Sequence, residues 1–206
     1  MILIGICGGT GSGKSTVARK IEKYFEKTGV VNMSVDSYYK NHADLNFEKR
    51  SKINFDHPDS IDFELLYNNL NSIKKNIKIT QPIYSYKVHK RLKKTNLITP
   101  KEIIIIEGLH VFYNDKINKL LDLKIFLDVD NKTRLERRII RDVKERGRSI
   151  DEIKKRYKKM CKPMYNKFIL PTKNSADIIS NSENSSIKKI IKLISKINKW
   201  SNILKI

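Results

Sequence analysis

The stretch that decides the fold is residues 2–16, which read ILIGICGGTGSGKST. Residues 2–7 are apolar apart from one glycine, and residues 8–15 follow the pattern Gly, four residues, Gly, Lys, Ser. The glycines permit positive φ and remove Cβ atoms, so that successive backbone N–H groups can surround a phosphate. Lys14 can neutralise β- and γ-phosphates, and the Ser15 hydroxyl can ligate Mg²⁺. Residues 2–16 therefore predict a strand followed by a phosphate-binding loop.

A helix is predicted directly after this loop, because Val17, Ala18, Ile21 and Phe25 recur at helical spacing before Gly29. The positive end of such a helix favours a bound phosphate. A Gly-rich turn that matched the pattern by chance would need neither the strand before it nor the helix after it. We expect the phosphates of a nucleoside triphosphate to be bound by Gly8, Gly9, Thr10, Gly11, Ser12, Gly13, Lys14, Ser15 and Thr16.

The rest of the chain predicts an α/β fold. Apolar segments without polar alternation predict strands at 30–35, 103–106, 123–127 and 176–179. Helical patterns lie between them, over 61–73 and from about 132, with a break near Gly147 and a restart from Ser149. Strands separated by helices favour a parallel sheet covered on both faces, a three-layer fold. Residues 76–101 are interpreted as a short polar hairpin.

The C-terminal segment has apolar residues at helical spacing from 187 to 197, with lysines between them. A basic amphipathic helix of this kind can lie on a membrane surface. More often such a helix packs its apolar stripe on the domain, and that is what we expect here.

The composition is that of one globular domain. The 206 residues hold 43 Lys and Arg against 22 Asp and Glu, a net charge of +21. The apolar runs are too short for a membrane span, the N-terminus lacks a signal-peptide pattern, and Cys7 and Cys161 fit a reducing compartment. The charge permits a nucleic-acid surface or a phosphate-handling site. Six arginines between 134 and 148 favour the second, since guanidinium groups bind phosphate bidentately.

Two carboxylates end predicted strands. Ligands of open parallel sheets bind at the carboxyl ends of the strands, where Asp36 and Glu107 are expected beside the phosphate-binding loop. Asp36 either acts in this site or caps the turn into residues 37–39. Glu107 follows four isoleucines, where a carboxylate is costly unless it is paired or lies near a metal.

Several further motifs follow in order along the chain. They are residues 35–39 (VDSYY), 54–59 (NFDHPD), 82–86 (PIYSY) with His89, 106–108 (IEG), 138–142 (RIIRD), 145–148 (ERGR), 162–164 (KPM), 171–173 (PTK) and 176–177 (AD). Together with the phosphate-binding loop they resemble the bacterial uridine kinase (uridine–cytidine kinase) family, from residue 2 to about residue 179. NFDHPD and ERGR in this order are specific to that family, whereas the loop alone is not.

The resemblance implies a single P-loop nucleoside kinase domain over residues 1–206. A substrate-binding hairpin would be inserted at about 76–101 and a helical lid would lie at about 138–160. Such an enzyme transfers the γ-phosphoryl group of ATP or GTP to the 5′-hydroxyl of uridine or cytidine, with Mg²⁺, and gives UMP or CMP in pyrimidine salvage. The resemblance further implies a cytoplasmic homo-oligomer, a tetramer, with nucleoside and nucleoside triphosphate substrates and no nucleic-acid or membrane partner.

The same resemblance implies a role for each site residue. Asp36 would be the general base, and Lys14 with the lid residues Arg141 and Arg146 would stabilise charge on the transferring phosphoryl group. Ser15, Glu107 and Asp36 would surround the metal ion. Nucleoside binding would involve Asp56 and Arg138 at the ribose hydroxyls, with Tyr84, His89, Phe55, Tyr39, Tyr86 and the lid residue Arg148.

The sequence departs from the family pattern at two places, and two other functions are compatible with parts of it. Arg156 stands where the family usually has Gln before Tyr157, which puts base selectivity in doubt, and residues 180–184 replace a Gly-rich segment. Within the same superfamily, the rival is a kinase acting on a sugar phosphate or pantothenate. From another class, the rival is a basic ATPase that binds nucleic acid, although no motif of alternating aromatic and basic residues supports it.

Overall fold

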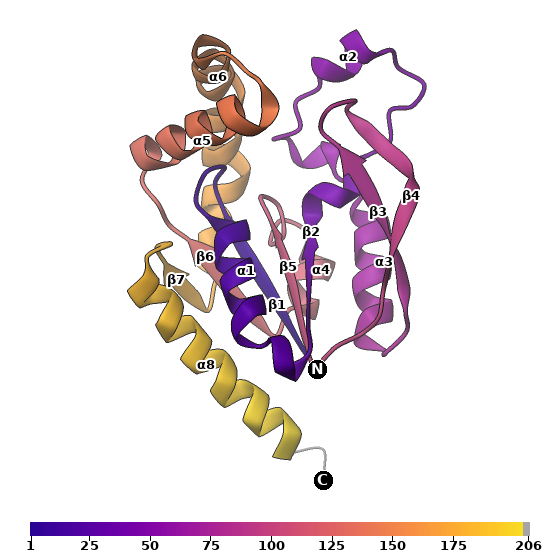
Figure 1. The fold of residues 1–206 in the computed structure, drawn as a ribbon, viewed down its shortest axis with the longest axis vertical. Helices are drawn as coiled ribbons and strands as arrows, with labels where there is room; N and C mark the ends of the chain where they lie inside the picture. The colour runs from indigo at the N-terminus through magenta and orange to yellow at the C-terminus, as the bar shows by residue number, and fades with distance from the viewer. Residues whose placement is uncertain (204–206) are drawn as a thin grey trace.

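A five-stranded parallel sheet forms the centre of the molecule (Figure 1). A computed structural model describes residues 1–203, with side chains for residues 1–197. The strand order is β2-β5-β1-β6-β7, so β1 lies in the middle of the sheet. The strands are β1 (Ile2–Gly8), β2 (Val30–Ser34), β5 (Ile103–Gly108), β6 (Leu123–Leu127) and β7 (Ile178–Ser180). Every residue of β1 and β5 is buried, as expected for strands with helices on both faces.

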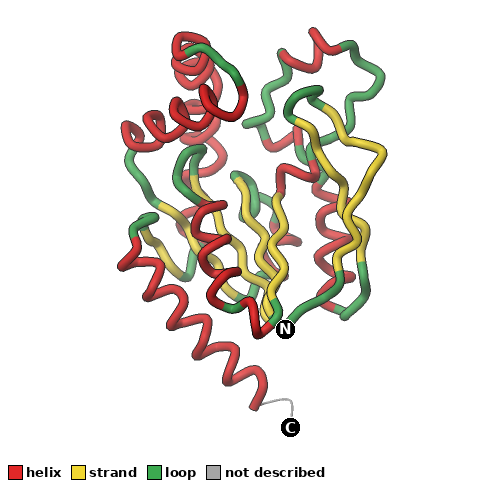
Figure 2. The backbone as a smooth tube through the Cα atoms, in the orientation of Figure 1, coloured by secondary structure: helices red, strands yellow, loops and turns green. Residues whose placement is uncertain are grey.

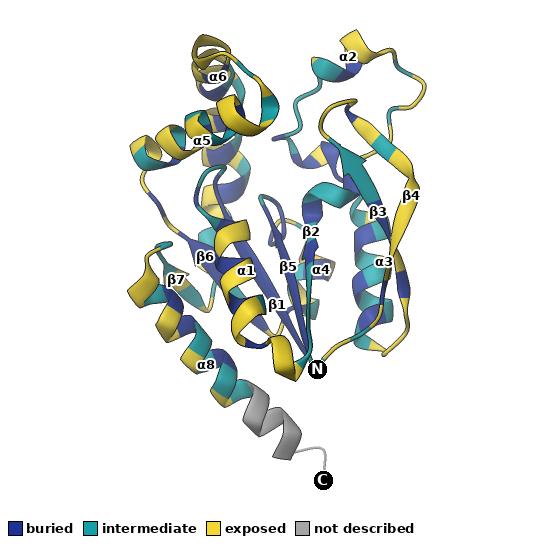
Figure 3. Ribbon diagram, in the orientation of Figure 1, coloured by how far each residue is buried: buried dark blue, intermediate teal, exposed yellow. Residues whose placement is uncertain are grey.

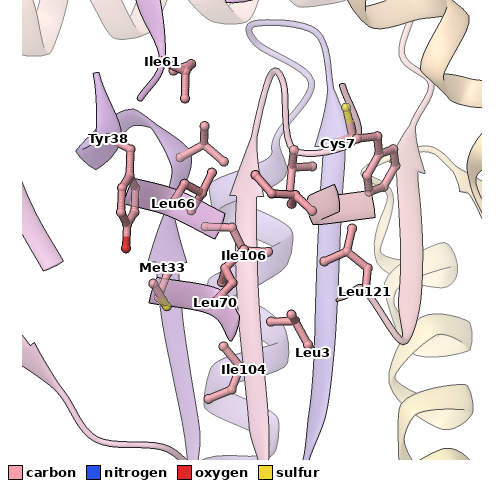
Figure 4. Packing of buried hydrophobic residues seen from close by; sticks show 14 of the residues in the cluster. Leu3, Cys7, Met33, Tyr38, Ile61, Leu66, Leu70, Ile104, Ile106 and Leu121 are labelled. Atoms are coloured by element: carbon pink, nitrogen blue, oxygen red, sulfur yellow. The ribbon is translucent and has the colours of Figure 1, made fainter. Parts of the chain in front are cut away.

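Two hydrophobic clusters show how the sheet is covered. Side chains of α1 (Lys14–Tyr24) and α8 (Asn184–Ile203) pack against one face, where β1 contributes Ile2, Ile4 and Ile6. Side chains of α3 (Phe63–Lys74) and α4 (Asp115–Leu120) pack against the other face, which includes Leu3 and Cys7 (Figure 4). Alternate residues of one strand therefore serve opposite layers, and the predicted three-layer α/β fold is confirmed.

Further elements reach above the carboxyl ends of the strands, among them a hairpin that runs beside α3 and has only its turn at this level. On one side are α5 (Asn131–Arg146) and α6 (Ile150–Arg156), and on the other are α2 (Phe47–Ser51) and the antiparallel hairpin of β3 (Ile79–Ser85) and β4 (Lys90–Ile98) (Figures 1 and 2). Gly147, with φ 63°, ends α5, and Ser149 caps α6 by accepting a hydrogen bond from Glu152 N. The predicted break and restart of the basic helix are thus confirmed.

Short turns complete the backbone between and after these elements. Short 3₁₀ segments cover Glu26–Thr28, Val35–Tyr38, Pro58–Ser60 and Leu170–Ser175. After α6 the helix continues as a π-turn at Tyr157–Cys161, a short α7 (Lys162–Met164) and a second π-turn at Tyr165–Ile169. Residues 150–169 therefore form one continuous helical segment that leads back toward the sheet.

The structure settles three smaller expectations. The second strand ends at Ser34 rather than Val35, because the Ser34 hydroxyl accepts a hydrogen bond from Asp36 N and starts a 3₁₀ turn. The C-terminal helix docks on the domain, with Ile187, Ile190 and Ile194 buried (Figure 3). In the described part of the chain no helix is long and apolar enough to cross a membrane.

Candidate active site

A cavity of about 550 Å³ opens where the strands end, between the hairpin and α5. Its walls contain most of the residues predicted to form the site. They are Thr10, Gly11, Gly13, Lys14, Ser15, Thr16, Asp36, Tyr39, Phe55, Asp56, Tyr84, Tyr86, His89, Glu107, Arg138, Arg141, Arg146 and Arg148. Gly8, Gly9 and Ser12 are buried and do not line it. The cavity therefore gathers residues from six separate parts of the sequence.

The phosphate-binding loop joins β1 to α1. Gly11 and Gly13 have φ of 77° and 90°, values that other residues rarely adopt. Lys14 folds back over the loop and donates hydrogen bonds from Nζ to the carbonyl oxygens of Gly8 and Gly9, at 2.9 and 3.0 Å. Burial lowers the pKa of Lys14, although Glu107 opposes the shift. An anion in the loop would offset this desolvation, as expected of a phosphate site.

Arg134, one of the six arginines predicted to handle phosphate, is buried behind the loop and supports it instead of lining the cavity. Its guanidinium carbon lies 3.7 Å from the centre of the Tyr165 ring, and its Nε donates to Val129 O at 3.0 Å. A Cβ atom on Gly9 or Gly11 would collide with Arg134. The sequence signal was only the position of Arg134 in the first turn of a helix after a strand, so its contact with the loop could not be foreseen.

An oxygen-rich site suited to a divalent cation lies beside the loop. The Ser15 hydroxyl donates to Glu107 Oε1 at 2.9 Å. Burial, followed by the Asp36 carboxylate, raises the pKa of Glu107 against the opposing effect of Lys14. Among the described residues no cluster of three His, Cys, Asp or Glu side chains could hold a metal alone. The hydroxyl and two carboxylates fit Mg²⁺, which retains waters and takes substrate phosphates as ligands.

Asp36 lies in the 3₁₀ turn that follows β2, and it lines the cavity. Its Oδ2 accepts a hydrogen bond from the Tyr86 hydroxyl at 2.5 Å. Partial burial and the Asp36 carboxylate raise the pKa of Tyr86, so this tyrosine stays protonated and acts as the donor. Asp36 does not cap the turn into residues 37–39. The cap is the Ser34 hydroxyl, which accepts a hydrogen bond from Asp36 N.

Aromatic side chains line the hairpin side of the cavity. The His89 ring stacks on Phe55 at 5.4 Å between centroids, and the Tyr84 ring lies 5.0 Å from that of Tyr39. Burial, together with nearby arginines of which Arg148 is the largest contributor, lowers the pKa of His89, so its imidazole is neutral at pH 7. The Tyr84 hydroxyl and His89 Nδ1 are buried without a hydrogen-bond partner. Two unpartnered polar atoms between aromatic rings are suited to reading the edge of a planar ring.

Asp56 and Arg138 stand on opposite elements at the same end of the cavity. The Cys161 thiol donates to Asp56 Oδ2 at 3.3 Å, and burial raises the pKa of Cys161 to about 12. The buried His110 contacts the backbone of the same residue, with Nε2 2.8 Å from the carbonyl oxygen of Asp56. Arg138 donates from NH1 to the Thr10 hydroxyl at 2.9 Å, so one side chain reaches from this end of the cavity to the phosphate-binding loop.

Five of the six clustered arginines face the cavity. Arg137, Arg138, Arg141, Arg146 and Arg148 line it, and Arg134 is buried behind the loop. The sequence therefore concentrates these charges around one enclosed site rather than on an outer face. Arg156, the departure noted in the sequence, also lines the cavity and donates to the carbonyl oxygens of Ser51 and Ile53 at 3.4 and 3.2 Å.

The fold and the cavity together define a P-loop kinase, because a phosphate cradle, an arginine cluster and a carboxylate all face one acceptor pocket. The chain belongs to the phosphoribulokinase/uridine kinase family, whose model matches residues 3–186. It is 47% identical over 178 residues to a uridine kinase of Clostridium tetani, covering 86% of this chain and 85% of that protein. It is 45% identical over 196 residues to a uridine kinase of Clostridium novyi, covering 95% and 94%.

A solved structure supports the fold independently. The phosphoribulokinase of Rhodobacter spheroides superposes with a TM-score of 0.63 at 18% sequence identity, covering 86% of this chain and 68% of that one. At this identity the likeness concerns the fold alone. The predicted P-loop type of fold and the predicted family are both confirmed.

Proposed function

We propose that this protein is a uridine kinase, which transfers the γ-phosphoryl group of ATP or GTP to the 5′-hydroxyl of uridine or cytidine. The observation that carries the proposal is that Asp36 lies between the phosphate-binding loop and the aromatic pocket in a single cavity. Phosphoryl transfer depends mainly on holding donor and acceptor in line with charge stabilisation around them. Uridine kinase relatives at 45–47% identity over most of the chain support the same acceptor.

Asp36 is the residue we assign to the acceptor hydroxyl. Because Oδ2 is held by Tyr86, Oδ1 is the oxygen left to accept the proton of the 5′-hydroxyl. Tyr86 fixes the carboxylate rotamer and keeps its own proton, since its pKa is raised by partial burial and by Asp36. Tyr86 thus acts as a positioning residue for the base.

The donor phosphates are assigned to the loop, Lys14 and the lid arginines. A phosphate in the loop would release Lys14 from the carbonyl oxygens of Gly8 and Gly9 and receive its charge. Arg141 and Arg146 lie across the cavity, where they can stabilise charge on the transferring group. Ser15, Glu107 and Asp36 would hold Mg²⁺, which when bound neutralises charge on the β- and γ-phosphates.

The nucleoside is assigned to the opposite end of the cavity. Asp56 and Arg138 offer an acceptor and a donor suited to the ribose 2′- and 3′-hydroxyls. Tyr39, Phe55, Tyr84 and Tyr86 supply ring contacts for the base, and Tyr84 and His89 supply polar atoms that lack partners in the protein. Arg148 lines the same cavity as His89, close enough that its charge lowers the pKa of that histidine, and we assign it to this end.

The wider expectations belong to the same proposal. We propose one kinase domain over residues 1–206, with the hairpin as its nucleoside-binding insertion and residues of about 138–160 as its lid. The two free cysteines suit a reducing cytoplasm, where pyrimidine salvage takes place. The homo-oligomer, a tetramer, rests on the family resemblance.

A panel of acceptors tests the function. The purified chain is incubated with Mg²⁺, ATP and each common ribonucleoside or deoxyribonucleoside in turn, and monophosphates are separated by chromatography. We expect UMP and CMP to form, with deoxyribonucleosides poor because Asp56 and Arg138 lose one hydroxyl. Phosphorylation of a sugar phosphate or pantothenate instead would refute the acceptor assignment. ATP hydrolysis that RNA stimulates, with no monophosphate formed, would point to the nucleic-acid-binding ATPase.

A further inference from the structure

Asp142 is a fully buried carboxylate for which the proposed chemistry has no role. It lies in the last turns of α5, its side chain is 0% exposed, and it is not among the residues that line the cavity. A buried carboxylate is costly unless it is paired, so its partners should explain it.

The partners of Asp142 are four arginines that all line the cavity. Arg141 donates a hydrogen bond from Nε to Oδ1 at 2.9 Å, and its NH2 forms an ion pair with the same oxygen at 2.8 Å. The other three guanidinium groups stay at longer distances: Arg146 is 3.5 Å from Oδ1, and Arg138 and Arg148 are 3.4 and 3.7 Å from Oδ2. Oδ2 makes no hydrogen bond. Asp142 therefore hydrogen-bonds one arginine and attracts the other three over longer distances, while Arg138 also donates to the Thr10 hydroxyl and Arg148 also pairs with Glu152.

The backbone creates this cluster by reversing direction at Gly147. Arg138 and Arg146 lie one turn before and after Asp142 on α5. The left-handed Gly147 then ends the helix, and Arg148 N donates to Asp142 O at 3.2 Å, which brings the Arg148 side chain back to the same carboxylate. The motif of residues 138–148 thus places four cations around a single anion.

The four arginines serve both proposed substrates. Arg141 and Arg146 are assigned to the phosphates, whereas Arg138 and Arg148 are assigned to the nucleoside end. Burial raises the pKa of Asp142, but Arg141, Arg146 and Arg138 outweigh it, so the carboxylate is ionised at neutral pH. Four positive charges against one negative charge leave the cluster at +3. A phosphate chain that enters the cavity must compete with Asp142 for the same guanidinium groups.

We propose that Asp142 is a positioning residue that gathers the four arginines and limits the strength with which they bind phosphate. This inference rests on the proposed function, since it takes the cavity to be the phosphate site. Asp142 keeps the guanidinium groups within reach of one another and cancels part of their charge, so that the nucleoside diphosphate product can leave. Removing its charge should strengthen anion binding and misplace the arginines during turnover. A purely structural role would instead weaken binding and turnover together.

The experiment compares three variants with the wild type. Asp142→Asn removes the charge, and Asp142→Glu keeps the charge but displaces it by one methylene. Asp122→Asn is the matched control, because Asp122 is also ion-paired, to Lys74 at 2.8 Å, and also accepts a backbone hydrogen bond, from Leu3 N, but lies outside the cavity. Tripolyphosphate binding is measured by titration calorimetry at low salt, and kcat and the KM for ATP are measured with uridine.

Asp142→Asn is expected to bind tripolyphosphate about tenfold more tightly than the wild type, with the gain shrinking as salt is added. Its kcat should fall by about tenfold or more while its KM for ATP also falls. Asp142→Glu should keep the wild-type affinity for tripolyphosphate and lose kcat, because the charge remains and the geometry changes. Asp122→Asn should leave both the affinity and kcat within about twofold of the wild type.

Unchanged or weaker tripolyphosphate binding by Asp142→Asn would overturn the inference. If this variant loses a cooperative thermal transition, Asp142→Glu decides, and wild-type kcat in that variant overturns the positioning role. A different result addresses the proposed function: if the wild type binds no tripolyphosphate in competition with ATP, the cavity is not the phosphate site.

Discussion

Replacing Asp36 with asparagine tests the chemical role of the carboxylate without rebuilding the pocket. An asparagine carbonyl oxygen can still accept the hydrogen bond that Tyr86 donates at 2.5 Å, so the aromatic wall keeps its contact. The amide cannot take a proton from the acceptor hydroxyl. The variant therefore removes proton acceptance, and one negative charge beside the proposed Mg²⁺ site, while it keeps the hydrogen bond from Tyr86.

The size of the effect follows from the loss of proton acceptance. A positioned general base contributes about 10²–10⁴-fold to the rate, equivalent to about 2.7–5.5 kcal/mol of activation free energy. Exchanging a charge-assisted hydrogen bond for a neutral one should change the free energy of unfolding by only about 1 kcal/mol. We therefore expect kcat to fall by at least about a hundredfold, with ATP affinity within about threefold of the wild type.

Kinetics and binding are measured separately. ADP release is followed by a coupled spectrophotometric assay with uridine and Mg²⁺–ATP, and ATP affinity is measured by calorimetry without nucleoside. Tyr86→Phe is the control, because it removes only the hydrogen bond to Asp36 and should cost severalfold rather than a hundredfold in kcat. A kcat for Asp36→Asn within tenfold of the wild type would refute the assignment of Asp36 as base.

Three further predictions concern the nucleoside end of the cavity and its support. His89→Ala should raise the KM for uridine at least about fivefold and leave the KM for ATP unchanged, since His89 stacks on Phe55 in the aromatic wall of the cavity; equal increases in both constants would contradict a role in base binding. Arg156→Gln should raise the KM for uridine severalfold and increase proteolysis near residue 52, because two hydrogen bonds to loop carbonyl oxygens are lost, whereas unchanged cleavage and KM would show that this contact is dispensable. The pKa of His110 is lowered by burial, so the unfolded chain takes up a proton that the folded chain resists, and stability should fall as the pH drops below about 6.5. Urea unfolding at pH 7.5 and 5.5 should show a smaller loss in His110→Asn than in the wild type, and an identical loss would exclude His110 as a contributor.

Local sequence patterns predicted well the part of the site that would bind the phosphates of the nucleoside triphosphate. The strand, loop and helix of residues 2–24 depend on short-range rules, namely apolar burial, glycine conformation and helical spacing. The position of Glu107 followed from strand topology, because parallel strands bring their carboxyl ends to one edge. Because both residues lie at this edge of the sheet, the Ser15 hydroxyl can donate its hydrogen bond to Glu107.

Contacts between distant segments could not be read from the same patterns. The support that Arg134 gives to the loop, and the cluster around Asp142, depend on how α5 crosses the ends of the strands. The boundary at Ser34 was missed by one residue, because a side-chain cap overrode the apolar Val35. The tertiary path of a helix is set by packing on both sides, and a periodic pattern specifies only which face is apolar.

The hairpin of β3 and β4 pairs with itself and shares no ladder with the five-stranded sheet. It supplies Tyr84, Tyr86 and His89, whereas the loop, Lys14 and Glu107 belong to the sheet and its connections. Acceptor choice and phosphate chemistry are in this sense separate modules of one polypeptide. A hairpin graft that keeps Tyr86, and with it the hydrogen bond to Asp36, would change the base contacts and leave the phosphate-binding loop untouched.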